Sequence, residues 1–175
     1  EADKQRLEAE HQKEIVEEKQ KEISDSINYA KRIQNAILPS TRYFKSNLPE
    51  SFILYLPKDV VAGDFYFMET VGENVILAVA DCTGHGVPGA MVSVVCHNAL
   101  TRSVKEFGLL KPNEILDKTR ELVLETFAKS EDQVNDGMDI ALCAFNTKTR
   151  SLQFSGANNG LFLVRNGELT EYKPD

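Results

Sequence analysis

The sequence predicts an α+β fold, an antiparallel β-sandwich flanked by helices in αββα layers and preceded by a long coiled-coil-like helix. Three observations lead to this prediction. Residues 1–38 contain no Gly or Pro, short apolar segments bounded by turn residues follow from Phe52, and a pair of helical segments interrupts them. Strands joined by hairpins, with helices inserted as a pair, favour layered antiparallel sheets.

The first element is a helix over residues 1–38, which we interpret as a signalling and dimerisation helix. One heptad position is apolar throughout, whereas the position that pairs with it is mostly polar. The two rows are Ala9, Val16, Ile23, Ala30, Ile37 and Gln20, Ile27, Gln34. This half of a coiled-coil seam predicts a weak parallel homodimer, and a single solvated helix is the alternative. Pro39 and Ser40 end the helix.

Residues 39–175 are predicted to form one domain of short strands and two helices. The strand segments, rich in β-branched and aromatic residues, are 52–56, 63–69, 74–81, 139–145, 152–157 and 161–167. Asn166-Gly167 is typical of a two-residue hairpin turn, and residues 145–154 indicate a second hairpin. The helical segments are 87–107, with Pro88 near its first turn, and the amphipathic segment 112–129.

The composition excludes several classes of function. The formal net charge is −7, with 20 Lys and Arg against 27 Asp and Glu. This balance argues against a nucleic-acid surface, because phosphate contacts need clustered basic residues. No apolar run approaches the ~20 residues of a membrane span, and the polar first 22 residues do not resemble a signal peptide. Three cysteines without C-x-x-C spacing favour a reducing cytoplasm over a disulfide framework or a zinc site.

Two aspartates in similar settings carry the strongest functional signal. Asp64 starts one predicted strand directly after Gly63, and Asp81 ends the next predicted strand. If these strands pair through the turn at residues 72–74, both carboxylates reach the same edge of the sheet and repel each other. Lys58 is the nearest basic residue upstream, so we expect a divalent cation to neutralise the pair.

The residues around the aspartates predict a phosphoryl-handling site. Carboxylate and carbonyl oxygens are hard ligands, which favour Mg²⁺ or Mn²⁺ over zinc. The loop after Asp81 places His85 among glycines, and the helix that follows has N-terminal N–H groups that attract phosphate. The alternative is that Asp64 caps a turn, Asp81 caps the helix, and the glycines only shape a tight loop.

Other catalytic motifs are missing from the sequence. It contains neither a G-x-x-x-x-G-K-[ST] loop nor a G-x-S-x-G elbow. His11 lies on the polar helix, and we interpret His97 as a core histidine of a buried helix. Nothing in the sequence marks Cys82 as a nucleophile.

The segment "GDFY" at residues 63–66, followed by "ADCTGHGVPGAM" at residues 80–91, resembles the SpoIIE-like branch of the metal-dependent serine/threonine protein phosphatases. The resemblance covers residues 39–175. The preceding "SINYAKRIQNAILPS" is similar to linkers that join sensor domains to these phosphatases. The resemblance implies two packed antiparallel sheets with flanking helices. It also implies two Mn²⁺ or Mg²⁺ ions and a metal-activated water that removes phosphate from phosphoserine or phosphothreonine.

Carried over residue by residue, the resemblance assigns metal ligands. Asp64 matches the aspartate of the first motif, and Asp81 matches the aspartate that bridges both metals. Cys82 matches the position that donates a backbone carbonyl. His85 matches no established role, a general-acid part being one hypothesis, and Asp139 lies where the family has no metal ligand.

The family has two further aspartate motifs near its C-terminus, and the sequence ends before either of them. We therefore expect the C-terminal part of the domain to be missing. We also expect residues 1–175 alone to bind metal weakly and to be weakly active or inactive. The start at Glu1 suggests a longer protein with an upstream sensor domain.

These observations lead to the hypothesis of a cytoplasmic phosphoprotein phosphatase in bacterial signalling, acting as a homodimer. Its expected substrate is a phosphorylated signalling protein, such as an anti-sigma-factor antagonist. A catalytically inert, dimerising signalling module is the alternative. A cyclase-like metal–nucleotide enzyme also uses paired aspartates, but no base-recognition pocket is evident in the sequence.

Overall fold

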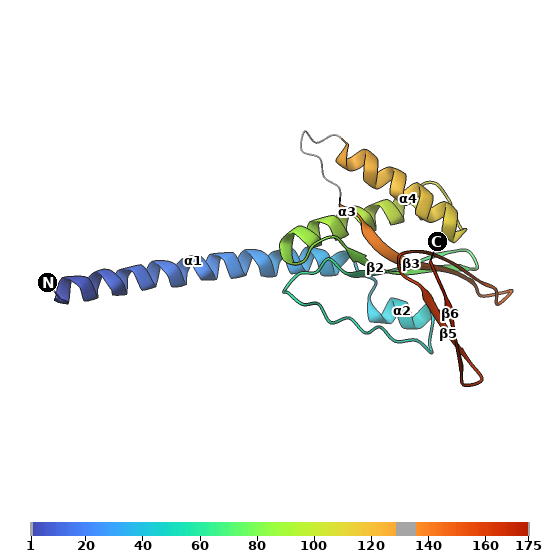
Figure 1. Cartoon of the computed structure of the whole chain (residues 1–175), viewed down its shortest axis with the longest axis horizontal. Helices are drawn as coiled ribbons and strands as arrows, with labels where there is room; N and C mark the ends of the chain where they lie inside the picture. The colour runs from blue at the N-terminus through green and yellow to red at the C-terminus, as the bar shows by residue number, and fades with distance from the viewer. Residues whose placement is uncertain (1, 129–135, 175) are drawn as a thin grey trace.

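A computed structural model describes residues 2–128 and 136–174 (Figure 1). Its elements in chain order are α1 (Ala2–Ile37), α2 (Thr41–Asn47), β1 (Phe65–Val71), β2 (Asn74–Cys82), α3 (Gly86–Lys105), α4 (Pro112–Phe127), β3 (Met138–Asn146), β4 (Leu152–Ala157), β5 (Leu161–Arg165) and β6 (Glu168–Tyr172). The strands and helices predicted from residue 63 onward are confirmed, with ends that differ by a few residues.

Four strands form one antiparallel sheet in the order β1-β2-β3-β4. The turn between β1 and β2 contains Gly72, whose φ of 57° is adopted most readily by a residue without a side chain. The register of this hairpin pairs Phe65 with Ala80. The residues before β1 therefore lie beside the end of β2, as the sequence predicts.

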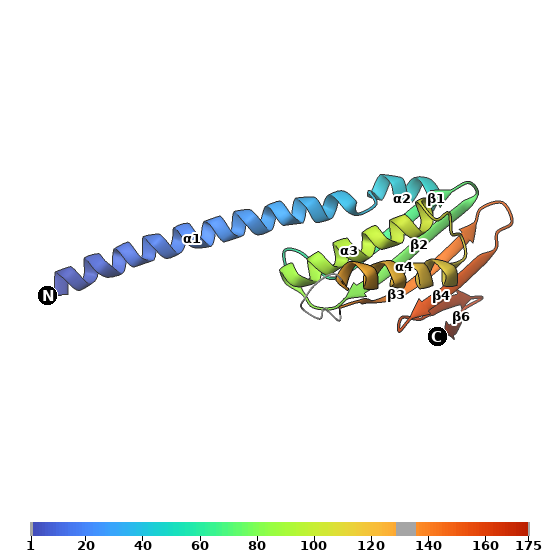
Figure 2. The same cartoon turned by 90° about the horizontal axis from the view of Figure 1, so that it is seen from above.

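Helices α3 and α4 cover one face of this sheet (Figure 2). Successive side chains of a strand point to opposite faces, so every second residue of β1–β3 meets the helices. Together they form one apolar core, whose largest fully buried hydrophobic members are Phe67, Ile76, Leu100, Ile115, Ile140 and Leu142. Burial of this apolar surface stabilises the hairpin that carries the two predicted aspartates.

The opposite face of the sheet carries the short helix α2, which the sequence did not predict. Ser40 begins this helix because its side chain accepts a hydrogen bond from the Tyr43 amide at 3.1 Å. The helix packs Phe44 against Met68 and Val75 in a second, smaller apolar cluster. Its seven residues are too few for a periodic pattern to reveal it.

The strand predicted over residues 52–56 is wrong. This segment is extended, but it pairs with no strand in the described part of the chain. The alternation behind the prediction is real, because Phe52, Leu54 and Leu56 are exposed whereas Ile53 and Tyr55 are partly buried. Alternation reports which side chains are buried, but a strand also needs a neighbouring backbone to pair with.

Strands β5 and β6 form a separate two-stranded sheet. Asn166 and Gly167 in their turn have φ of 55° and 82°, as a type I′ turn requires, which confirms the hairpin predicted there. With two antiparallel sheets and flanking helices, the predicted α+β class is confirmed.

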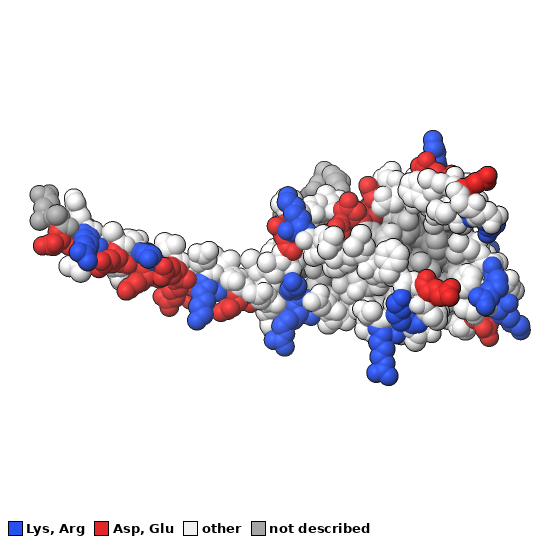
Figure 3. Space-filling model, turned by 90° about the horizontal axis from the view of Figure 1, so that it is seen from below, with Lys and Arg blue, Asp and Glu red and all other residues white. Residues whose placement is uncertain are grey.

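Helix α1 projects away from the body, and only its last turns lie against it (Figure 1). Acidic and basic side chains cover its exposed length (Figure 3), and four ion pairs at helical spacing link them: Lys4–Glu8, Arg6–Glu10, Lys13–Glu17 and Lys19–Glu22. Such pairs stabilise an isolated helix by ~0.2–0.5 kcal/mol each. None of the described helices combines the length and apolar character needed to cross a membrane.

The sequence pattern assigns one face of α1, here called the stripe, to a dimer interface. The C-terminal part of this stripe packs against the body of the domain. Ile27, Ala30 and Ile37 are partly buried, and Gln34 is buried, with 4% of its surface exposed. Farther toward the N-terminus, Val16 and Ile23 are about 60% exposed. The stripe thus has two parts, one packed on the body and one facing solvent.

Candidate active site

Asp64 and Asp81 lie side by side at one end of the β1–β2 hairpin. Asp64 immediately precedes β1 and Asp81 is the penultimate residue of β2, so the pairing of Phe65 with Ala80 makes them neighbours. Strand periodicity puts both carboxylates on the face opposite α3, where both residues are exposed. The structure therefore brings together the two aspartates that the sequence singles out.

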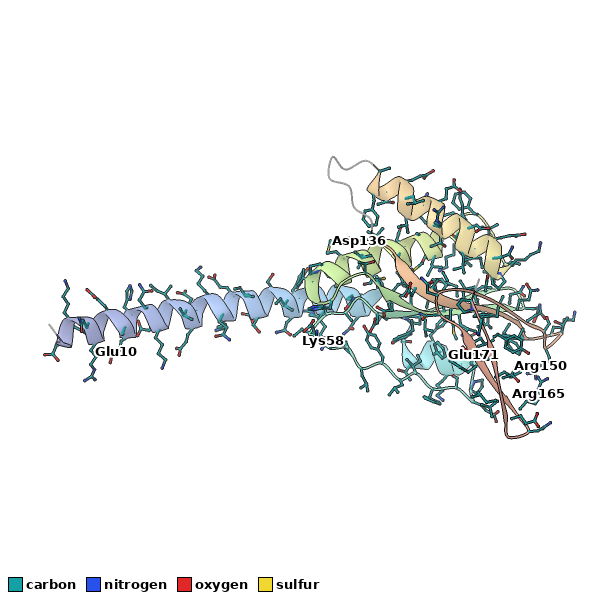
Figure 4. The ribbon with its side chains drawn as sticks, in the orientation of Figure 1. Glu10, Lys58, Asp136, Arg150, Arg165 and Glu171 are labelled. Carbon is teal, nitrogen blue, oxygen red and sulfur yellow. The ribbon has the colours of Figure 1, made fainter. Side chains whose placement is uncertain are left out.

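This end of the sheet is the one from which α1 departs. Figure 4 shows Lys58 and Asp136 there, whereas Arg150 and Arg165 lie toward the far ends of the hairpins. Asp136 comes just before β3, whose first residue, Met138, pairs with the last residue of β2. The carboxylate pair is thus close to the helix interpreted as a signalling element.

The two carboxylates affect each other electrostatically. Partial burial, followed by the hydrogen bond and the charge of Asp81, raises the pKa of Asp64 above its usual range. Among the described residues, no Lys or Arg forms an ion pair with either aspartate. The described part of the body has four ion pairs of Lys or Arg, and all of them involve other carboxylates. The pair therefore carries negative charge that the described side chains do not neutralise.

A pocket of about 300 Å³ opens beside the pair. Its lining combines the two carboxylates with the extended segment 53–56, Tyr66, Val79 and Asn159. The segment 53–56 therefore forms one wall of the candidate site. A pocket with apolar walls and few polar groups is typical of a small-ligand site.

Three glycines pack the loops of the site against each other. A Cβ atom on Gly63 would lie 2.7 Å from the Gly84 carbonyl oxygen and 3.0 Å from that of Cys82. A Cβ atom on Gly89 would lie 2.5 Å from the same Gly84 oxygen and 3.1 Å from the Gly63 Cα atom. Real Cβ atoms keep a greater distance from backbone atoms. The loop before Asp64, the loop after Asp81 and the start of α3 can therefore pack this closely only because Gly63 and Gly89 have no side chain.

Tyr55 fixes the other side of Asp64. Its hydroxyl donates a hydrogen bond of 3.1 Å to the Asp64 carbonyl oxygen, and its ring makes an edge contact with Tyr66 at 5.5 Å. Burial, followed by the charge of Asp64, raises the pKa of Tyr55, which keeps the hydroxyl protonated as a donor. Sequence reasoning missed this residue, although the alternating pattern of residues 52–56 indicates that Tyr55 faces inward.

Replacing Tyr55 with Phe removes only this hydroxyl. We expect the Tyr55→Phe protein to lose ~0.5–1.5 kcal/mol of unfolding free energy, because one intramolecular hydrogen bond is lost while the ring stays packed. Urea unfolding followed by circular dichroism measures the change. Tyr29→Phe, on the exposed surface of α1, is the matched control, and an equal loss in both variants would contradict the assigned role.

His85 lies at the N-cap position of α3 and interacts with Asp59. Its Nδ1 atom is 2.9 Å from Asp59 Oδ2, and a proton on Nδ1 is donated to that carboxylate. The interaction links the loop before Gly63 to the start of α3. Sequence reasoning did not identify Asp59, since nothing in the sequence places it beside a histidine 26 residues later.

The thiol of Cys82 points away from the carboxylates, toward the helix face of the sheet, and only 3% of the residue is exposed. Contact with Cys96, followed by burial, raises the pKa of Cys82 well above its usual range. The thiol is therefore neutral at physiological pH and unsuited to nucleophilic attack. This leaves the backbone carbonyl as the group of Cys82 that can serve the site.

The donors at this edge fit a hard divalent cation. Asp64 and Asp81 provide carboxylate oxygens. The carbonyl oxygen of Cys82 lies next to Gly63, in the same pair of loops. Within residues 2–128 and 136–174, no three His, Cys, Asp or Glu side chains form a metal-binding cluster. Two carboxylates are fewer protein donors than such a cluster provides, but they are of the kind that could hold Mg²⁺ or Mn²⁺, ions that retain several waters.

Asp139 is engaged elsewhere, although the register places it opposite Asp81. Its Oδ1 atom accepts a hydrogen bond of 2.7 Å from the Asn158 side-chain amide. Asn158 has a φ of 61°, a conformation that asparagine tolerates better than most residues. The family resemblance does not assign Asp139 to the metal site, and the structure gives its carboxylate this separate partner.

The sheet with its helix pair is similar to PP2C phosphatase domains of known structure. The SiaA-PP2C domain of Pseudomonas aeruginosa matches 89% of this chain and 61% of its own length, with a TM-score of 0.80 and 35% identity. The structure of the PP2C phosphatase domain and a fragment of the regulatory domain of SpoIIE from Bacillus subtilis shares the fold. It matches 66% of this chain and 32% of its own length, with a TM-score of 0.51 and 16% identity.

The chain belongs to the SpoIIE family, because residues 72–175 match the family described as Stage II sporulation protein E (SpoIIE). It is also similar to the phosphoserine phosphatase RsbU of Bacillus subtilis (strain 168), with 26% identity over 141 residues. That similarity covers 81% of this chain and 39% of RsbU. The family resemblance read from the sequence is confirmed, and the chain spans less than two thirds of the length of these relatives.

Proposed function

We propose that residues 39–175 form part of a metal-dependent phosphatase domain that removes phosphate from phosphoserine or phosphothreonine in a bacterial signalling protein. The observation that carries this proposal is the exposed, uncompensated pair Asp64 and Asp81 at the end of the β1–β2 hairpin. Membership of the SpoIIE family and similarity to the phosphoserine phosphatase RsbU support it.

In this proposal, Asp64, Asp81 and the Cys82 carbonyl hold Mn²⁺ or Mg²⁺, as their hard oxygen donors allow. When bound, the ions would supply a water molecule activated for attack on phosphorus. The protein residues orient the reactants. The two carboxylates determine where the ions would bind. The close contacts of Gly63 and Gly89 hold together the loops that carry these carboxylates.

The start of α3 is the proposed binding place for phosphoryl oxygens. His85, at its N-cap, makes no side-chain cap hydrogen bond to the first turn, so it leaves these N–H groups to other acceptors. Helix N-termini attract anions through such groups and through the helix dipole. In this role α3 stabilises negative charge that develops on the phosphoryl group, and no covalent enzyme intermediate is required.

The proposal is tested by metal-dependent hydrolysis of p-nitrophenyl phosphate and of a phosphoserine peptide by the full-length protein. We expect hydrolysis that depends on added Mn²⁺ or Mg²⁺ and stops with a chelator. A folded full-length protein that hydrolyses neither compound with either ion would contradict the proposal. It would favour a catalytically inert signalling module.

The proposed setting is the cytoplasm, with a phosphorylated signalling protein as substrate, such as an anti-sigma-factor antagonist. Cys82, Cys96 and Cys143 are all free and buried, which fits a reducing compartment. Burial raises the pKa of Cys143 to about 11, so this thiol is also unreactive at neutral pH. An upstream sensor domain attached to α1 completes the proposed arrangement.

We also propose that α1 forms a parallel homodimer through its solvent-facing stripe. The Ile23→Asp protein should dissociate at least ~10-fold more readily than wild type, because burying one Ile contributes ~1.5–3 kcal/mol. Sedimentation over a range of concentrations measures this shift. Asn28→Asp adds a carboxylate elsewhere on the helix and should leave the dimer intact. A wild-type protein that stays monomeric at high concentration would contradict the proposal.

A further inference from the structure

Asn159 is a polar residue of the candidate pocket that the proposed chemistry does not use. It lies in the turn between β4 and β5 and lines the pocket of about 300 Å³ together with Asp64 and Asp81. Among the described residues, Asp139 takes up the side-chain amide of Asn158, whereas that of Asn159 makes no hydrogen bond. Asn159 therefore brings an uncharged donor and an uncharged acceptor to a pocket that contains two carboxylates.

The turn that carries Asn159 is held in place from both sides. Its neighbour Asn158 donates a hydrogen bond of 2.7 Å to Asp139 and forms a backbone bridge with Ile140. On the other side, a Cβ atom on Gly156 would collide with the Asn159 carbonyl oxygen, so the turn packs directly on the backbone of β4. A group on a fixed backbone loses less conformational entropy when it binds a ligand than a group on a loose loop does.

The register of the sheet places Asn159 at a distance from the phosphoryl chemistry. Asp81 on β2 pairs with Asp139 on β3, and Asn158 follows the end of β4, the next strand along. Neighbouring strands are ~4.8 Å apart, so the end of β4 is about 10 Å from the backbone of Asp81. This is wider than one phosphoryl group. A substrate whose phosphate is held at Asp81 therefore meets Asn159 with a part that lies beyond the phosphate.

The other walls of the pocket fit a protein substrate. Leu54, Leu56 and Val79 line it with apolar side chains, and each of them is more than half exposed. Such walls suit the aliphatic parts of a polypeptide and offer nothing to a free phosphate ion. A peptide group presents one N–H donor and one C=O acceptor, and a side-chain amide such as that of Asn159 complements both.

We infer that Asn159 is a substrate-binding residue that recognises the peptide main chain beside the phosphorylated residue. The inference rests on the proposed function, because it takes the phosphate to be bound at Asp64 and Asp81. The Asn159 amide donates to a carbonyl of the substrate and accepts from one of its N–H groups. No covalent bond is made or broken at Asn159. Its contribution is to the binding of a phosphoprotein in preference to small phosphate esters.

The test is an Asn159→Ala substitution in the full-length protein, assayed on three substrates at saturating Mn²⁺. A phosphoserine peptide has peptide groups on both sides of the phosphate, whereas free phosphoserine and p-nitrophenyl phosphate have none. We expect kcat/KM for the peptide to fall about 10-fold more than kcat/KM for the two small substrates, because two hydrogen bonds are lost. The change should be in KM and not in kcat, because these bonds are equally strong in the ground state and the transition state.

Two further variants separate recognition from stability. Asn28→Ala makes the same chemical change on the exposed surface of α1 and should match wild type on all three substrates. Asn159→Asp keeps the size of the side chain but loses the donor, and its charge repels a substrate carbonyl, so it should show the same peptide-selective loss. It also serves as the test variant if Asn159→Ala does not fold. Calorimetric titration should give wild-type Mn²⁺ affinity in both Asn159 variants, because Asn159 is no metal ligand in this proposal.

The outcomes distinguish this inference from the proposed function. A wild-type protein that hydrolyses none of the three substrates overturns the proposed function and the inference together. An active wild type, with an unchanged KM for the peptide in folded Asn159→Ala and Asn159→Asp, overturns the inference alone. An equal rise in KM for all three substrates also overturns it, because Asn159 would then contact the phosphoryl group. A loss of Mn²⁺ affinity would overturn it as well, because the effect would then come from the metal site.

Discussion

Replacing Asp81 with Asn in the full-length protein should abolish most metal-dependent phosphatase activity while leaving the fold intact. The substitution keeps the size and removes the charge of one of two adjacent carboxylates. Changing a group that only orients a metal ligand costs ~10–100-fold, so losing a ligand should lower turnover at least ~100-fold. Hydrolysis of p-nitrophenyl phosphate with saturating Mn²⁺ measures the effect.

The same variant should not lose stability. Asp81 is exposed, and its charge contributes to the raised pKa of Asp64. Without a metal ion, the fold therefore holds two carboxylates close together although they repel each other. We expect the unfolding free energy of the metal-free Asp81→Asn protein to stay within ~0.5 kcal/mol of wild type or to rise. This separates a functional carboxylate from one that merely caps the loop, whose removal would destabilise the protein by about 1 kcal/mol.

Glu73→Gln provides the matched control for charge removal on the same hairpin. Glu73 lies in the β1–β2 turn at the far end from Asp81, and its carboxylate accepts a hydrogen bond from Thr147 that Gln can also accept. Its activity should match that of wild type. Near-normal Mn²⁺-dependent activity in Asp81→Asn would show that the site has been assigned to the wrong residues.

Replacing Gly89 with Ala should be the most damaging single-methyl substitution at the site. Ala is favoured over Gly inside a helix by about 1 kcal/mol, so propensity alone predicts a gain in stability. The contacts predict the opposite, because the new Cβ would meet backbone atoms of Gly84 at 2.5 and 2.8 Å. Backbone cannot rotate away as a side chain can, so α3 must move off both loops.

We expect Gly89→Ala to lower the unfolding free energy by ~1–3 kcal/mol, the usual cost of overpacking. Its metal-dependent activity should also fall at least ~10-fold, because the displaced loops carry Asp64 and Asp81. Urea unfolding and p-nitrophenyl phosphate hydrolysis measure the two effects. Gly137→Ala is the control, since a Cβ there meets nothing within 4 Å and its φ is not positive. Unchanged stability in Gly89→Ala would refute the tight packing of the three glycines.

The sequence alone was sufficient for the elements whose cause is local. Alternating apolar residues and turn residues revealed β1 to β4, and Asn166-Gly167 revealed the β5–β6 turn, because these signals act over a few neighbouring residues. The pairing of Asp64 with Asp81 was also predictable, because a two-residue turn sets the register of a hairpin and hence which residues lie opposite. The family resemblance then gave these two aspartates a chemical role.

Contacts between residues far apart in the chain were decided only by the tertiary structure. The strand predicted at residues 52–56 has no partner among the described strands, since pairing depends on what lies beside a segment. In the sequence, Gln34 is a polar residue in a heptad row that a coiled coil would fill with apolar residues. In the structure it is buried and hydrogen-bonded to Ala62, 28 residues later. A heptad pattern shows that one face of a helix is apolar, but it does not specify which surface covers that face. For α1 this surface is partly the body itself, because the buried groups of Ala62 need the hydrogen bonds that Gln34 provides.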